Sequence, residues 1–154
     1  MHNDYVISTD KAKLDVPAIH DFISNRSYWG KDRTMETVQK TIDNSFCFGV
    51  YDKTGKLVGY ARVVTDFTIF AYLMDVFILE EYRSLGLGKH LIHHIVNHPD
   101  LKDIRFWRLD TKDAHGLYGK YGFKEPEFPQ AIMEIRKGPA NREEQRTAET
   151  DGSR

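Results

Sequence analysis

Apolar residues recur at helical spacing in three parts of the chain, and each part has a suitable capping or breaking residue. Asp15 is placed to cap the first helix, the second runs from Thr34 to about Asp43, and Pro99 ends the third. A shorter helix is predicted within residues 113–121. The apolar positions of the first three are Val16, Ile19, Phe22 and Ile23, then Met35, Val38 and Ile42, then Leu87, Leu91, Ile92, Ile95 and Val96.

Short apolar segments with bounding turn residues predict strands at residues 4–8, 46–52, 56–66, 71–79, 104–110 and 131–137. The tripeptide Lys-Thr-Gly at 53–55 predicts a hairpin between two of them. A meander of strands followed by alternating strands and helices indicates an α/β fold of the α+β kind. We expect a mixed, mostly antiparallel central sheet flanked by helices.

The chain has 154 residues, enough for one domain with a single core. We expect this domain to span residues 1–136. Residues 137–154 contain no large apolar side chain, and their acidic and basic residues balance. They are predicted to form a polar, disordered tail with no catalytic role.

Composition excludes several classes of protein. A formal net charge of -1 gives no reason to expect nucleic acid or an anionic membrane as a partner. No apolar run approaches the roughly 18 residues of a membrane span. With Cys47 as its only cysteine, the chain can form no internal disulfide. We therefore expect a cytoplasmic protein.

The stretch DVFILEEYRSLGLGKHL at 75–91 places glycines before a helix, where backbone N–H groups have no intrahelical partners and bind phosphate. It is not a P-loop, because His90 follows Lys89 and Arg83 stands where the first glycine is needed. It is not a dinucleotide fingerprint, because Leu91 occupies the third glycine position. The pattern that remains is Arg-x-x-Gly-x-Gly, which by itself is also typical of a helix cap.

A second stretch, TKDAHGLYGKYGF at 111–123, follows in the order and spacing of a known pair of motifs. Together they resemble the GNAT superfamily of acyl-CoA-dependent N-acyltransferases, and the sequence is similar to a generic bacterial branch of it. The resemblance covers residues 4–136. It implies a sheet that splays between its fourth and fifth strands, with acetyl-CoA as co-substrate and no metal.

The resemblance also implies which residues hold the coenzyme. Backbone groups of the splayed strand pair with the pantetheine arm, and one N–H there stabilises the oxyanion. The pyrophosphate lies against the glycine loop. Ser84 and Thr111 stand where the family usually has glycine and asparagine. The implied coenzyme residues are Val76, Phe77, Ile78, Arg83, Ser84, Leu85, Gly86, Leu87, Gly88, Lys89, Thr111 and Tyr118.

Tyr118 matches the motif tyrosine that donates a proton to the departing thiolate as general acid. An ordinary phenol has a pKa of about 10 and a thiol about 8.5, so the proton moves only once sulfur is negative. The alternative is that Tyr118 packs with Tyr121 and Phe123 as a core aromatic.

The general base is less evident. Strict alternation places Tyr72, Met74, Val76 and Ile78 on one face of the strand and Asp75 and Phe77 on the other. The resemblance puts the base on the face of Tyr72 and Met74, which cannot act as one. Asp75 is the nearest carboxylate, although it matches an aspartate that stabilises the fold. Weaker candidates are Asp66, Glu80 and His115, or a chain of waters.

The loop SYWGKDR at 27–33 lies where the resembled fold lines the acceptor site. Tyr28 and Trp29 offer flat apolar surface and Arg33 could bind a carboxylate, or the aromatics fill the core. His90, His94 and His98 have a spacing compatible with a metal, but a solvated face of the helix explains them more simply.

These features predict an N-acetyltransferase that moves an acetyl group from acetyl-CoA to a primary amine of a small molecule or peptide, by direct attack in a ternary complex. The alternative is a non-catalytic acyl-CoA-binding sensor or scaffold, which the missing strand carboxylate favours. The acceptor is not readable from the sequence. An exposed final strand could pair two chains into a homodimer.

Overall fold

The structure is a computed structural model that describes residues 2–137. It divides into two compact units, Met1–Asp110 and Thr111–Arg154. All but the first residue of the predicted tail at 137–154 lies outside the described residues. Within them, no helix is long and apolar enough to cross a membrane.

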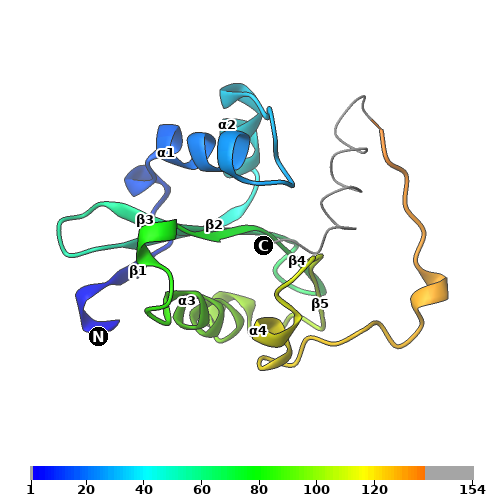
Figure 1. Ribbon diagram of the computed structural model, residues 1–154. Coiled ribbons are helices and arrows are strands. Elements are labelled where there is room, and N and C mark those ends of the chain that lie inside the picture. The colour runs from blue at the N-terminus through cyan, green and yellow to red at the C-terminus, as the bar shows by residue number, and fades with distance from the viewer. Residues whose placement is uncertain (1, 138–154) are drawn as a thin grey trace. The chain divides into compact units, whose positions relative to one another are not determined.

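The first unit is built on a five-stranded sheet in the order β1-β2-β3-β4-β5 (Figure 1). Strands β1 to β4 are antiparallel to one another in sequence order, and β5 runs parallel to β4. This mixed sheet confirms the predicted fold class. The strands are β1 (Val6–Ser8), β2 (Phe46–Tyr51), β3 (Leu57–Thr65), β4 (Phe70–Ile78) and β5 (Phe106–Arg108).

The predicted hairpin joins β2 to β3. The backbone N–H of Asp52 donates to the Lys56 carbonyl at 3.0 Å, and the Asp52 carboxylate accepts from the N–H of Thr54 at 2.8 Å. Gly55 has φ of +88°, which glycine adopts without the strain that a side chain would bring. The local sequence thus closes the hairpin.

Helices α1 (Val16–Asp21) and α2 (Met35–Asp43) cover one face of the sheet (Figure 1). Asp15 caps α1 as predicted, and Thr34, the expected first residue of the second helix, caps α2; each accepts a hydrogen bond from a backbone N–H of the first turn. A π-helical turn, Phe22–Arg26, extends α1. The core on this side is formed by Ile19, Phe22, Ile23, Val38, Ile42, Cys47, Tyr51, Leu57, Tyr60, Phe77 and Leu79.

Helix α3 (Leu87–Val96) lies on the other side of the sheet (Figure 1). The predicted apolar stripe is its buried face: Leu87, Leu91, Ile92 and Ile95 are each at most 2% exposed. Asn97 ends the helix, and Pro99 opens a 3-10 turn, Pro99–Leu101, that leads toward β5. The stripe therefore fixes the start of α3 against the sheet.

The ladder between β3 and β4 contains a bulge. Its register shifts between Tyr60 and Arg62 of β3, and across this shift Asp75 and Val76 face the single residue Ala61. Asp75 has a φ of +54°, in the left-handed region that non-glycine residues seldom adopt. Bulges leave the extra residue outside the ladder and bend the strand.

The bulge overturns the predicted alternation along β4. Tyr60 and Arg62 share one face of β3 and pair with Phe77 and Met74, so Met74 and Phe77 lie on the same face. Ile78 pairs with Gly59, which is next to Tyr60 along β3, so Ile78 lies on the opposite face. Strict alternation assumes that each residue of one strand faces one residue of the other. The extra residue of the bulge shifts all later side chains of β4 to the other face.

Strands β4 and β5 part after a short shared ladder. Phe70, Ala71 and Tyr72 pair with Phe106, Trp107 and Arg108. Strand β5 ends there, while β4 continues to Ile78. The predicted splay between the fourth and fifth strands is confirmed.

The second unit contains helix α4 (His115–Gly119), as predicted, but not the final strand expected at 131–137. A 3-10 turn, Pro129–Ala131, precedes residues 132–137, which form neither helix nor strand. Met133 and Ile135 are 93% and 84% exposed. A strand exists only as part of a ladder, and this segment has no partner strand among the described residues, so its apolar pattern alone was misleading.

Removing the central side chain of the α3 stripe should destabilise the fold. Leu91 is fully buried, so Leu91→Ala should lower the free energy of unfolding by about 2–5 kcal/mol, through lost burial and a cavity. His93→Ala, on the exposed side of the same helix, should change it by less than about 0.5 kcal/mol. Denaturant titration of both variants measures this, and similar losses would contradict the packing described.

Candidate active site

A buried carboxylate lies at the bulge of β4. Asp75 Oδ2 accepts hydrogen bonds from Arg62 Nε at 2.6 Å and Arg33 Nη1 at 2.9 Å. Its Oδ1 accepts one from Trp29 Nε1 at 2.9 Å. The Asp75 side chain is 1% exposed. Both carboxylate oxygens are thus engaged by donors from β3 and from the loop before α2.

Arg62 is the most buried partner in this group, which we call the Asp75 cluster (Trp29, Arg33, Arg62 and Asp75). Its side chain is 8% exposed, and Nη1 also donates to Ser45 Oγ at 3.2 Å. Buried charges are costly unless paired and hydrogen-bonded, and both conditions hold here. The cluster ties together β3, β4 and the helical layer.

The cluster also holds Asp75 in its left-handed backbone conformation. Such a residue costs on the order of 1–3 kcal/mol, and it persists only where the surroundings over-determine it. Three side-chain partners supply that constraint. The bulge is therefore a fixed feature of β4 and not a local irregularity.

The loop predicted to line the acceptor site supplies two of these partners. Trp29 packs near Phe22, with ring centroids 6.4 Å apart, and its indole N–H points to Asp75. Tyr28 meets the Trp29 ring edge-on at 5.3 Å. Trp29 packs against the core, which was the alternative interpretation of this loop.

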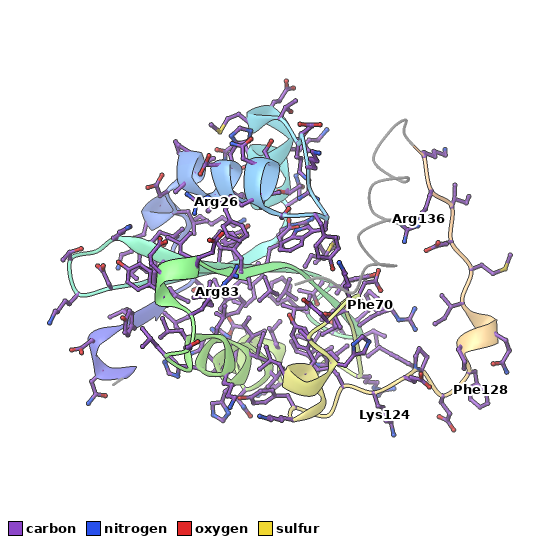
Figure 2. The ribbon with its side chains drawn as sticks, in the orientation of Figure 1. Arg26, Phe70, Arg83, Lys124, Phe128 and Arg136 are labelled. Carbon is purple, nitrogen blue, oxygen red and sulfur yellow. The ribbon has the colours of Figure 1, made fainter. Side chains whose placement is uncertain are left out.

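The segment between β4 and α3 forms the predicted glycine loop. Gly86 has φ of +80° and caps α3, whose first residue is Leu87. Arg83, labelled in Figure 2, donates from Nε to the Ile78 carbonyl at 3.0 Å, which anchors the loop to the end of β4. The first turn of a helix presents backbone N–H groups without intrahelical partners, so this arrangement suits an anion.

A phenol and a carboxylate meet where β4 and β5 part. Tyr72 donates its O–H to Asp110 Oδ2 at 2.7 Å. Tyr72 is half-buried, and Asp110 is exposed just beyond the end of β5. By the ladder registers, Tyr72 lies on the same face of β4 as Met74 and the Asp75 cluster.

In the second unit, Tyr118 is buried and packs edge-on against Phe123, with ring centroids 5.9 Å apart. The Thr111 hydroxyl oxygen accepts a hydrogen bond from the Ala114 N–H at 3.0 Å, just before α4. Both residues therefore have structural contacts within their own unit, in the motif that the sequence analysis singled out.

Comparison with known proteins decides the family. The sequence model of the Acetyltransferase (GNAT) family matches residues 13–123. The chain belongs to the GNAT acetyltransferase family.

Individual relatives agree with this assignment. A GNAT-family structure from Xanthomonas campestris pv. campestris is 45% identical, with a TM-score of 0.84, over 86% of this chain and 93% of that one. A protein from Gibberella zeae that is classed as an acetyltransferase is 33% identical, over 76% of this chain and 77% of its own. A Deinococcus radiodurans structure shares the fold at 20% identity, with a TM-score of 0.70, over 89% of this chain and 91% of that one. This GNAT protein is therefore an acyl-transfer enzyme.

One departure from the GNAT motif has a visible consequence. Ser84, where the family usually has glycine, adopts φ of +65°, in the left-handed region. A side chain there costs on the order of 1 kcal/mol. The glycine loop of this GNAT protein thus keeps a conformation that glycine would adopt more easily.

The histidines of α3 do not form a metal site: no group of ligands able to hold a metal ion occurs within residues 2–137. They are also less solvated than predicted. His94 and His98 lie edge-on to the Phe48 ring, with centroids 6.0 and 5.7 Å away. Partial burial, and then the charges of the neighbouring histidines, lower the pKa of His94 below its ordinary value.

Sequence reasoning did not find Asp110, and two carboxylates that it did consider are positioned for other work. Asp66 Oδ1 accepts hydrogen bonds from the backbone N–H groups of Ile69 at 2.8 Å and Thr68 at 2.9 Å, which lower the pKa of Asp66 and close the turn before β4. Glu80 lies in the exposed 3-10 turn Glu80–Tyr82. The position of Asp110 at the end of a predicted strand could have indicated a functional residue. Its hydrogen-bond partner, Tyr72, is 38 residues away in sequence, so the contact itself was not predictable.

Removing the charge of Asp75 should cost far more stability than removing an exposed one. Asp75→Asn leaves Arg62 buried without its counter-charge, and we expect a loss of about 3–5 kcal/mol in the free energy of unfolding. The matched control is Asp21→Asn, whose ion pair with Arg26 is exposed and worth about 0–1 kcal/mol. Denaturant titration compares them, and equal losses would show that the Asp75 cluster does not stabilise the fold.

Proposed function

We propose that this GNAT protein transfers an acetyl group from acetyl-CoA to a primary amine by direct attack in a ternary complex. The observation that carries the proposal is the bulge at Asp75 and Val76, followed directly by the glycine loop and α3. A bulge provides backbone groups outside the ladder, and the loop provides anion-binding N–H groups, in the order that a thioester and its pyrophosphate need.

Acetyl-CoA would be held by backbone groups of Val76, Phe77 and Ile78 and by the segment from Arg83 to Lys89. Two local features suit this ligand. Gly86 is left-handed at the start of a ten-residue helix, and Arg83 Nε donates a hydrogen bond to the Ile78 carbonyl at the end of β4. The helix dipole adds to the attraction for the pyrophosphate.

We assign Asp75 a positioning role instead of that of general base. Its carboxylate oxygens accept bonds from Arg33, Arg62 and Trp29, and a proton taken up there would displace one of them. In this role Asp75 fixes the bulge so that the Val76 N–H stabilises the oxyanion of the tetrahedral intermediate. Trp29 and Arg33 then contribute by holding Asp75 in place. Tyr28 is proposed to border the acceptor site.

Direct transfer is favoured over a covalent acyl-enzyme by the state of Cys47. The thiol is 1% exposed, and burial raises its pKa above the ordinary value. The thiolate needed for nucleophilic attack is therefore disfavoured.

Tyr118 is the proposed general acid, on the strength of its place in the motif, with Thr111 contributing one contact to the coenzyme. Tyr118→Phe should lower turnover by about 10²-fold while keeping affinity for acetyl-CoA, since only the proton donor is lost. The control is Tyr121→Phe in the same segment, which should keep full activity. The assay is release of coenzyme A thiol with a panel of putrescine, ethanolamine, glycinamide and a short peptide.

The assay tests both the acetyl transfer and the general-acid role of Tyr118. Amine-dependent thiol release by the wild type supports acetyl transfer, and its loss in Tyr118→Phe alone supports the general acid. A wild type that binds acetyl-CoA but releases no thiol with any amine of the panel would contradict the proposal. Unchanged turnover in Tyr118→Phe would remove that residue's assignment.

The glycine loop can be tested separately. Gly86→Ala and Gly55→Ala each put a side chain at a positive φ, +80° and +88°, and should lose a similar 1 kcal/mol or so of stability. Only Gly86→Ala should weaken acetyl-CoA binding, because Gly55 lies in the β2–β3 turn with open space around it. Isothermal titration with acetyl-CoA measures this, and equal affinities would contradict the assigned coenzyme site.

A further inference from the structure

The resemblance places the general base on the face of β4 that carries Tyr72 and Met74, and neither of these side chains can act as a base. A carboxylate from outside β4 lies beside this face. Tyr72, on that face, donates its O–H to Asp110 Oδ2 at 2.7 Å. The contact joins β4 to the residue just beyond β5. It therefore brings a carboxylate to the place where the two strands separate.

Two ladder pairs put Tyr72 on the same face of β4 as the Asp75 cluster. Val64 pairs with Tyr72, and Arg62 pairs with Met74, so Tyr72 shares a face with Arg62. Arg62 in turn binds Asp75 at the bulge. With a strand rise of about 3.3 Å per residue, Tyr72 lies roughly 10–13 Å along β4 from Val76.

That separation suits a proton acceptor that works through an intervening group. The side chains of Tyr72 and Asp110 span part of the distance, and a nucleophile beside the thioester spans more. Water can complete the path between them. Asp110 is exposed, so a proton that it receives can pass on to solvent.

Asp110 differs from Asp75 and Asp66 in how it is held. Asp75 is bound by two guanidinium groups and an indole, and Asp66 by backbone N–H groups of its own turn. Within residues 2–137, Asp110 accepts a single neutral hydrogen bond, from the Tyr72 phenol, and its side chain is exposed. It keeps lone pairs with which to take a proton.

We propose that Asp110, oriented by Tyr72, is the proton acceptor for the attacking amine. This inference rests on the proposed acetyl transfer. The amine nitrogen forms a bond to the thioester carbon and the carbon–sulfur bond breaks. The proton lost by the nitrogen passes through water to Asp110 and then to solvent, and the thiolate takes its proton from the general acid.

The decisive variant is Asp110→Asn, with Asp103→Asn as its matched control. Asp103 is an exposed aspartate in the connection between α3 and β5 that has no assigned role. Asp110→Asn should lower kcat/KM for the best amine of the panel by about 10²-fold, as loss of a general base does, with acetyl-CoA affinity unchanged. Asp103→Asn should match the wild type. Because both residues are exposed, both variants should fold.

The pH profile separates a proton acceptor from a merely structural residue. The profile is measured with putrescine, an alkylamine whose pKa is close to the value of about 10.4 for lysine, so its free form increases close to tenfold per pH unit below that value. The wild type, which removes the proton itself, should show a shallow profile from about pH 6.5 to about pH 9. Asp110→Asn should rise close to tenfold per unit over the same range. Tyr72→Phe, which leaves the carboxylate in place but loosely held, should lose about tenfold and keep the shallow profile.

Failure of the Asp110 proposal can be told apart from failure of the proposed acetyl transfer. An active wild type with Asp110→Asn within about twofold of it, at every pH, would overturn the role of Asp110 and leave acetyl transfer standing. A steep profile that appears only in Asp110→Asn would support it. A wild type that transfers acetyl to no amine of the panel would overturn both.

Discussion

The ion cluster around Asp75 is the interaction on which the rest of the molecule depends. One carboxylate, 1% exposed, binds the guanidinium groups of Arg62 and Arg33 and the indole of Trp29. These partners come from β3 and from the loop that precedes α2, so the contact fixes the helical layer to the sheet. It also holds a non-glycine residue at a φ of +54°.

Two consequences for function follow from that local distortion. The bulge takes backbone groups of β4 out of the ladder and changes which side chains share a face. Strand β5 ends after its pairing with Tyr72, so among the described residues no strand pairs with this edge of β4 beside the bulge. In a GNAT acetyltransferase, an open edge with an unpaired N–H is what a thioester and its pantetheine arm require. The glycine loop and the start of α3 follow β4 along the chain, in the order that the proposed coenzyme site needs.

Much of this arrangement was predictable from the sequence, and the exceptions have a common cause. Helix caps at Asp15 and Thr34, the β2–β3 hairpin and the stripe of α3 are local, and the two motifs identified the family. The bulge, the partners of Asp75 and the contact between Tyr72 and Asp110 depend on pairing between distant segments. The final strand was wrongly predicted because an apolar pattern does not provide a partner strand.

The most direct test of the central claim is the amide NMR signal of Val76 during titration with acetyl-CoA and, separately, with coenzyme A. If the thioester carbonyl oxygen accepts a hydrogen bond from the Val76 N–H, acetyl-CoA should shift the amide proton resonance downfield. Coenzyme A lacks this carbonyl and should not reproduce the shift. Signals from Arg83 to Lys89 should respond to both ligands. A Val76 signal that responds equally to both, or to neither, would contradict the account.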